Sequence, residues 1–173
     1  MKKLLLGLLC TVALGAYANP ADDLLNRIDK GAAAKFKTIL VKSDKDFFEI
    51  DQAGNGKNAT ASKPAGKNNP IIIRGNSWVN IAVGINWYLK HHAGIHITWN
   101  NMNQKLPNVL PAVKQKERHE TDLKLRYDFN YCTFSYTMAF WDWNRWQKEI
   151  DWMALHGINM PLAAVGTECV WRN

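Results

Sequence analysis

The sequence predicts an α/β protein in which a small N-terminal α/β domain precedes the first β-α-β unit of an incomplete (β/α)8 barrel. Strand-like and helix-like patterns alternate along the chain, which favours strands connected by helices. Five of the eight tryptophans lie within residues 126–171, around one aromatic helical pattern. The apolar run 158–165 follows that pattern directly and is typical of a parallel strand buried on both faces.

Composition divides the chain into four predicted parts. Its 173 residues suffice for one ordinary domain, or for a small domain and part of another. We expect a signal peptide at 1–18, an N-terminal α/β domain at 19–105, a linker at 106–126 and the truncated start of a barrel at 127–173.

The first residues have the pattern of a cleaved secretory signal. Lys2 and Lys3 precede the apolar run 4–13, and small residues in Ala16-Tyr17-Ala18 suit cleavage before Asn19. We therefore expect a secreted or periplasmic protein. The apolar run is too short to cross a bilayer, so we expect no stable membrane insertion.

The charge pattern argues against a nucleic-acid partner. The formal net charge falls from +7 to +5 when Lys2 and Lys3 are removed. Many remaining lysines lie between Lys30 and Lys67, scattered through polar, turn-forming sequence that is typical of a solvated surface. Attraction to acidic glycans is the alternative that this charge leaves open.

We expect no metal and no cofactor. Cys132 and Cys169 remain in the mature chain and can pair in an oxidising compartment, but they do not have the spacing of metal ligands. His91, His92 and His96 lack a suitably spaced cysteine or carboxylate partner.

Alternating patterns predict the elements of the N-terminal domain. A first helix is expected over 21–33, because Asp22 and Asp23 suit its first turn and apolar residues follow at helical spacing. β-branched and aromatic runs predict strands at 47–50, 71–73 and 95–99, and the Gly- and Asn-rich segment 54–70 is typical of an exposed loop.

A second helix is expected between the strands at 71–73 and 95–99. Asn76 or Ser77 can cap its N-terminus, and Gly94 supplies a stop. The segment 106–126 that follows contains two prolines and many charges, which indicates a linker between domains.

The last third of the chain predicts a strand, a helix and a second strand. The first strand is expected over 131–138. Asp142 can cap the helix, and Trp141 and Trp146 are spaced to form a hydrophobic staple across that cap. Gly157 is expected to end the helix.

This helix is expected to have an apolar and a polar face. The apolar face would comprise Trp146, Ile150, Met153 and Ala154. Arg145 and Glu149 form an i, i+4 pair on the polar face, worth roughly a few tenths of a kcal/mol. The strand at 158–165 is expected to be buried, although Pro161 removes one backbone donor from it.

Functional residues of a (β/α)8 barrel lie at the carboxyl ends of its strands. Those ends are expected near Ser135-Tyr136 and near Glu168. Glu168 is therefore a candidate polar site residue, and an ordinary surface-loop carboxylate is the alternative that the pattern leaves open.

The same segments resemble the alpha-N-acetylglucosaminidases, glycoside hydrolase family 89. The resemblance covers most of residues 71–171 and is most specific in its last third. Its motifs are Arg74-Gly75-Asn76, Tyr88-Leu89-Lys90 and Trp99 upstream, then Asn130-Tyr131-Cys132-Thr133, Ser135-Tyr136, Trp141-Asp142-Trp143, Arg145-Trp146, Glu149-Ile150-Asp151-Trp152-Met153-Ala154-Leu155, Gly157-Ile158-Asn159 and Gly166-x-Glu168-x-x-Trp171.

The resemblance implies an exo-acting glycosidase that releases terminal alpha-linked N-acetylglucosamine with retention of configuration. Such hydrolysis needs two carboxyl groups about 5–5.5 Å apart. In the family both are glutamates on later barrel strands, so we expect none of the catalytic residues within this chain. The implied partner is a glycan with terminal alpha-linked N-acetylglucosamine.

The resemblance also implies that this chain contributes part of the sugar pocket. Asn130 and Cys132 match first-strand positions that touch the N-acetylglucosamine ring. Tyr136 and Glu168 are expected to support the pocket wall. An inert buried thiol is the alternative for Cys132.

A non-catalytic, secreted carbohydrate-binding module is the alternative function. The aromatic-rich, exported composition also fits that class. A closed fold ending near Asn173 with exposed, coplanar aromatic rings would distinguish it from the start of a barrel.

Overall fold

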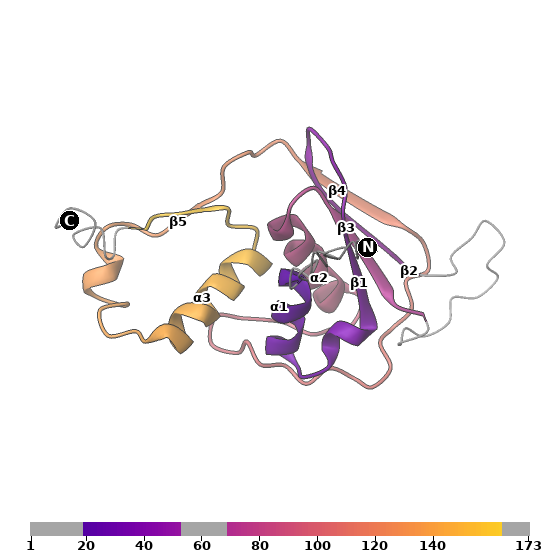
Figure 1. The fold of residues 1–173 in the computed structure, drawn as a ribbon, viewed down its shortest axis with the longest axis horizontal. Coiled ribbons are helices and arrows are strands. Elements are labelled where there is room, and N and C mark those ends of the chain that lie inside the picture. Colours follow the sequence, from indigo (N-terminus) through magenta and orange to yellow (C-terminus); the bar gives the residue numbers. More distant parts are fainter. Residues whose placement is uncertain (1–18, 53–68, 164–173) are drawn as a thin grey trace, which may run out of the picture.

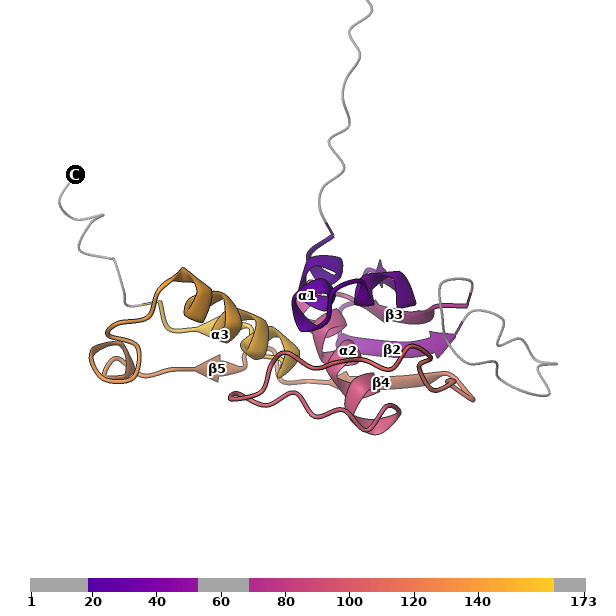
Figure 2. The same cartoon turned by 90° about the horizontal axis from the view of Figure 1, so that it is seen from below.

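The computed structural model describes residues 19–52 and 69–163. Two layered units lie side by side (Figures 1 and 2). In the first, helices α1 and α2 cover a sheet of four strands. In the second, helix α3 lies over the two short strands β5 and β6.

The elements follow one another in a fixed order. They are α1 (Pro20–Ile28), a 3-10 helix (Ala32–Lys35), β1 (Phe36–Leu40), β2 (Asp46–Gln52), β3 (Ile71–Gly75), α2 (Trp78–His91), β4 (Glu117–Thr121), β5 (Tyr127–Asp128), a 3-10 helix (Thr133–Ser135), α3 (Trp143–Leu155) and β6 (Met160–Pro161). Among the described residues, none of these helices is long and apolar enough to cross a membrane.

The larger sheet has the order β1-β3-β2-β4 and is mixed. β1 is parallel to β3, whereas β2 is antiparallel to both β3 and β4. α2 packs closely on this sheet at Gly84, where an added Cβ would lie 2.7 Å from the Ile73 side chain. The core between helices and sheet is apolar, with Ile50, Ile85 and Tyr88 fully buried.

The two expected helices form, although the first is shorter than predicted. α1 ends at Ile28 instead of residue 33, because the chain turns through Gly31, which has a φ of +86°. Asn26 Oδ1 accepts the Gly31 N–H at 3.1 Å and stabilises this turn. At α2, Ser77 is the confirmed N-cap: its hydroxyl accepts the Asn80 N–H at 3.1 Å.

The strands predicted at 47–50 and 71–73 are confirmed as β2 and β3, and the one predicted at 95–99 is wrong. Residues 95–99 form no strand, and the sheet instead contains the unpredicted β1 and β4. β4 lies within 106–126, so this segment is not merely a linker: it pairs with β2 and buries Leu110 and Val113 in the core. A charged strand such as Glu117–Thr121 carries no apolar alternation because it occupies an edge of the sheet.

The strand prediction over 131–138 is also wrong. Those residues form turns and a 3-10 helix, and the strand lies just before them at Tyr127–Asp128. The expected strand at 158–165 is present as β6, which is parallel to β5 as predicted. β6 is exposed rather than buried, with Met160 39% accessible.

The cap, staple and stop predicted for α3 are confirmed. Asp142 Oδ1 accepts the Arg145 N–H at 2.9 Å, and the Trp141 and Trp146 rings lie 5.3 Å apart across the cap. Gly157 follows the helix with a φ of +82°.

The predicted faces of α3 are confirmed at Met153, which is buried, and wrong at Ile150 and Glu149. Ile150 is 46% exposed, whereas Glu149, assigned to the polar side, is only 2% exposed. Glu149 accepts the Trp99 indole N–H at 2.6 Å and pairs with Arg145 at 2.9 Å. Asp151 on the same helix is also buried and binds Arg27 of α1. The helix therefore packs against the rest of the chain through these carboxylates as well as through apolar side chains such as Leu155, which lies in the hydrophobic core.

Arg126 connects the two units at the point where β5 begins. Its Nη1 donates to Asp46 Oδ2 at 2.9 Å and its Nη2 to Asn80 Oδ1 at 3.2 Å, both in the N-terminal unit. Its Nε donates to the carbonyl of Gly157, in the turn after α3. Its backbone carbonyl accepts the Met160 N–H of β6 at 3.2 Å. One side chain thus fixes β5 and β6 relative to the first sheet.

We predict that Arg126→Lys loosens the junction, because one ammonium cannot replace a fork that binds several acceptors at once. The expected loss in free energy of unfolding is about 2 kcal/mol, with faster amide exchange at Met160 and Leu162. Urea unfolding and hydrogen exchange measure the two effects. Arg118→Lys, at a 39% exposed ion pair, is the matched control; equal effects of both substitutions would contradict a special role for Arg126.

A pH dependence follows from Asp46. Hydrogen bonds from Asn76 and Arg126 hold its pKa below the ordinary value. Because the pKa of Asp46 is lower in the folded than in the unfolded protein, its ionised carboxylate stabilises the fold at pH values above the unfolded pKa of about 3.9. This contribution to the free energy of unfolding is lost as the pH falls through the folded pKa. We expect Asp46→Asn to flatten the decrease in unfolding free energy from about pH 5 to pH 2. The exposed Asp44→Asn is the matched control; an unchanged slope in Asp46→Asn would refute the assignment.

Candidate functional site

The candidate site lies at the carboxyl ends of β5 and β6. The strands pair in parallel, with Tyr127 opposite Met160 and Asp128 opposite Pro161. The Leu162 N–H continues the ladder by donating to the Asp128 carbonyl at 3.0 Å. Both strands therefore end at one edge, which is where functional groups collect in a (β/α)8 barrel.

The residue after β5 has a strained backbone. Phe129 has a φ of +75° and is the one non-glycine residue with positive φ among residues 19–52 and 69–163. Such conformations cost free energy and cluster at functional sites. The Asp128 carboxylate supports the turn by accepting the Phe129 N–H at 2.8 Å. This geometry turns the chain sharply away from the strand and starts the next turn.

Asn130 organises that next turn through its side-chain oxygen. Oδ1 accepts the backbone N–H of Cys132 at 2.9 Å and that of Thr133 at 3.2 Å, and it lies 3.2 Å from the Thr133 hydroxyl. Asn130 is exposed, and its Nδ2 donates to no other described side chain or backbone group. The amide oxygen is therefore fixed, and the exposed side chain leaves its two N–H donors available to a ligand.

The structure brings three of the four predicted substrate-binding residues into one short segment. Asn130 and Cys132 share the turn directly after β5, so they follow the first strand rather than lie in it. Cys132 is half-buried and is a free thiol. Tyr136 lies just after the 3-10 helix and is 79% exposed. Glu168 and the possible disulfide partner Cys169 lie outside the described residues.

An apolar cavity adjoins this turn. It measures about 370 Å³ and lies between α3 and the two strands. Its walls include Phe129, Phe134, Trp146 and Leu162. The Phe134 ring lies 5.9 Å from Phe129 and 6.0 Å from Trp146. A site for a hydroxylated sugar needs polar groups, so this cavity is the interior between helix and strands and the polar turn is the candidate site.

The turn offers hydrogen-bonding groups and no acid–base pair. Asn130 supplies an amide, Thr133 a hydroxyl and Tyr136 a phenol, all of which suit sugar hydroxyls or an acetamido group. Within the described ranges no cluster of three His, Cys, Asp or Glu side chains is placed to hold a metal ion. The arrangement can therefore bind and orient a polar ligand.

Two residues that shape the site are not predicted from the sequence. No sequence pattern indicates a positive φ at an aromatic residue such as Phe129. Thr133 belongs to the family motif, and the structure adds that its N–H and hydroxyl both bond to Asn130 Oδ1. The spacing Asn-x-x-Thr after a strand could have indicated a side-chain-capped turn.

Comparisons with known proteins agree with this architecture. Residues 19–112 match the family model described as the alpha-N-acetylglucosaminidase (NAGLU) N-terminal domain. Residues 126–173 match that of the NAGLU TIM-barrel domain, which begins at Arg126. The chain is 43% identical over 102 residues to human alpha-N-acetylglucosaminidase, covering 59% of this chain and 14% of the human protein.

Solved structures of a family 89 glycoside hydrolase from Clostridium perfringens are similar in fold. The complex with 2-acetamido-1,2-dideoxynojirmycin has a TM-score of 0.74 and 31% identity, over 88% of this chain and 16% of that one. The same coverage and identity, with a TM-score of 0.75, hold for a double glutamate-to-glutamine variant in complex with its substrate GlcNAc-alpha-1,4-galactose. The chain spans about one-sixth of these relatives at most. From the match over more than half of its residues, the chain belongs to the alpha-N-acetylglucosaminidase family, glycoside hydrolase family 89.

Proposed function

We propose that this chain forms the N-terminal part of an exo-acting, retaining glycoside hydrolase that releases terminal alpha-linked N-acetylglucosamine from glycans. The observation that carries the proposal is the Asn130 turn at the carboxyl end of β5, within the segment that matches the family's barrel domain. Its outward amide suits a sugar hydroxyl or acetamido oxygen.

The exposed second unit supports further barrel strands in the longer protein. β5 and β6 form a sheet of only two strands among the described residues, so each has an unpaired edge there. Phe140, Trp143 and Ile150 are exposed around them, with Phe140 99% accessible. Large apolar side chains exposed to this degree are consistent with an interface that further parts of the longer protein would cover. These open edges also disfavour the alternative of a self-contained carbohydrate-binding module.

The acid and the nucleophile would come from residues beyond position 173. A retaining glycosidase needs two carboxyl groups whose pKa values are pushed apart, one protonating the leaving oxygen and the other attacking the anomeric carbon. The turn after β5 supplies neither group. Asn130 would then orient the sugar, and the carboxyl groups of the later residues would carry out the hydrolysis.

We predict that the longer protein containing this chain cleaves an aryl alpha-N-acetylglucosaminide, and that residues 1–173 alone do not, because two strands cannot close a barrel. Release of the aryl alcohol measures the hydrolytic activity of the longer protein and of the 173-residue chain. Absence of turnover by a well-folded longer protein would reject the proposal, and repeatable turnover by the pure 173-residue chain would overturn the assignment of both carboxyl groups to later residues.

Asn130→Asp in the longer protein tests the sugar-binding role separately from folding. The substitution keeps an oxygen that can accept the Cys132 and Thr133 N–H groups but removes the outward N–H donors. We expect kcat/KM to fall by roughly 10- to 100-fold at unchanged thermal stability. Asn108→Ala, at an exposed loop residue, is the matched control. Equal kcat/KM for both variants would exclude substrate contact by Asn130.

Export is part of the same proposal. Residues 1–18 lie outside the described residues, so this part rests on the charged, apolar and small-residue pattern of the sequence. Asn19 already has a structural role: its Oδ1 accepts the Ala21 N–H at 3.0 Å and its Nδ2 donates to Thr38 at 2.7 Å. Cleavage before Asn19 would leave this helix cap intact.

We therefore expect the protein purified from a secreting host to begin at Asn19. Mass spectrometry of the intact protein and of its N-terminal peptide measures this. An Ala18→Arg substitution should block processing, because the cleavage site needs a small residue. Retention of the first 18 residues in the wild-type protein, outside the cytoplasm, would contradict the predicted cleavage.

A further inference from the structure

We propose that the groove between α3 and the segment 99–103 is an ancillary binding site for an uncharged saccharide, separate from the turn after β5. Two adjoining cavities of about 330 and 290 Å³ form the groove and share Met102, Asn103 and Lys148. Each is close to the lower end of the volume range of small-ligand sites. Neither is lined by Asn130 or its turn.

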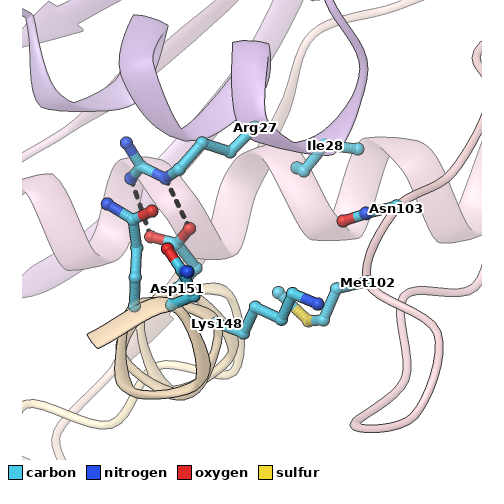
Figure 3. A pocket seen from close by; sticks show the side chains of 8 residues that line it. Arg27, Ile28, Met102, Asn103, Lys148 and Asp151 are labelled. Carbon is cyan, nitrogen blue, oxygen red and sulfur yellow. Dashed lines mark hydrogen bonds and ion pairs between the residues drawn. The ribbon is translucent and has the colours of Figure 1, made fainter. Parts of the chain in front are cut away.

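The two walls of the groove come from different parts of the chain. Figure 3 shows Met102 and Asn103 on the loop facing Lys148 and Asp151 on α3, with Arg27 of α1 closing the far side. Arg27 binds Asp151 through two hydrogen bonds of 2.6 and 2.7 Å. This bidentate pair holds α1 against α3 and fixes the width of the groove.

Trp99 provides a rigid aromatic surface at one end. Its indole N–H donates to the buried Glu149 at 2.6 Å, and the Arg145 guanidinium lies 4.6 Å from its ring centroid. Trp99 as a whole is nevertheless 41% exposed. An aromatic side chain that is held in place while its surface stays accessible loses little entropy on binding, which suits stacking against the apolar face of a sugar ring.

Unpartnered amides line the groove beside this ring. The side chains of Asn100, Asn101 and Asn103 on the loop, and of Asn144 and Gln147 on α3, bond to no other described residue. An amide both donates and accepts, so pairs of amides on facing walls match the hydroxyl groups of a saccharide. This combination with an accessible tryptophan selects sugar over an apolar ligand.

The charges of the groove balance almost completely. Asp151 pairs with Arg27 and Glu149 with Arg145, which leaves Lys148 as the lining cation without an ion pair among the described residues. Recognition would therefore depend on hydrogen bonds and stacking. An uncharged saccharide fits this surface better than a polyanionic one, which would need several free cations.

The test titrates the 173-residue chain with GlcNAc-alpha-1,4-galactose and follows the side-chain amide and indole N–H resonances by NMR. The groove proposal rests on the proposed function only in the choice of this disaccharide as the probe. We expect the Trp99, Asn103 and Gln147 signals to shift, with a dissociation constant on the order of millimolar. Raising NaCl from about 50 to about 300 mM should change the affinity by less than roughly twofold.

Matched variants separate this groove from the turn after β5. Asn103→Ala should weaken the binding reported by the Trp99 and Gln147 signals roughly fivefold, as expected for one lost hydrogen bond, whereas the exposed loop variant Asn108→Ala should not. Both Asn103 and Asn108 are exposed, so neither substitution should disturb the fold.

Three results would contradict the proposal that the groove binds a saccharide. The first is the absence of shifts up to about 50 mM disaccharide, which is well above the expected dissociation constant. The second is a set of shifts that Asn103→Ala leaves unchanged. The third is an affinity that falls steeply as the salt concentration rises. Shifts abolished by Asn130→Asp alone would reject the groove while supporting sugar binding after β5. The hydrolysis assay on the longer protein is independent of all these results.

Discussion

The relation between the two units depends on the guanidinium of Arg126. This side chain contacts the first sheet through Asp46, the start of α2 through Asn80 and the turn after α3 through Gly157. Only arginine carries donors in a fixed fork that can serve such separate acceptors. Because Arg126 is also the last residue before β5, its side chain fixes the orientation of the strand that presents Asn130.

The rest of the interface combines apolar packing around Leu155 with several polar contacts. Asp151 binds Arg27, Glu149 binds both Trp99 and Arg145, and the Leu155 carbonyl accepts a hydrogen bond from Asn86 at 3.1 Å. Buried ion pairs contribute little net stability when desolvation is counted, but removing one partner is costly. Such contacts therefore define one relative arrangement of α3 and the N-terminal unit. An apolar interface would allow neighbouring arrangements of similar energy.

That arrangement has consequences at two places, the carboxyl ends of β5 and β6 and the outer side of α3. At the strand ends, the positive φ of Phe129 and the capping oxygen of Asn130 form a turn with a defined shape before any ligand arrives. On the outer side of the helix, the same carboxylates that hold α3 in place immobilise Trp99 and complete the polar groove. The interface thus positions two polar surfaces with one set of contacts.

Local signals in the sequence determined where the helices begin and end. Ser77 and Asp142 act as caps, Trp141 and Trp146 form the staple, and Gly157 ends α3, because each interaction joins residues within a few positions of one another. The motifs around Asn130 and Cys132 likewise indicated the family.

Only the tertiary structure decided which strands pair and which helix face is buried. β4 has no apolar pattern because it occupies an edge of the sheet, and its partner β2 lies about seventy residues earlier. Glu149 can be buried because the Trp99 indole donates a hydrogen bond to it and Arg145 neutralises its charge. The residue spacing within α3 does not reveal the contact with Trp99. Contacts between distant segments depend on how the chain folds back on itself, and the local sequence does not contain that information.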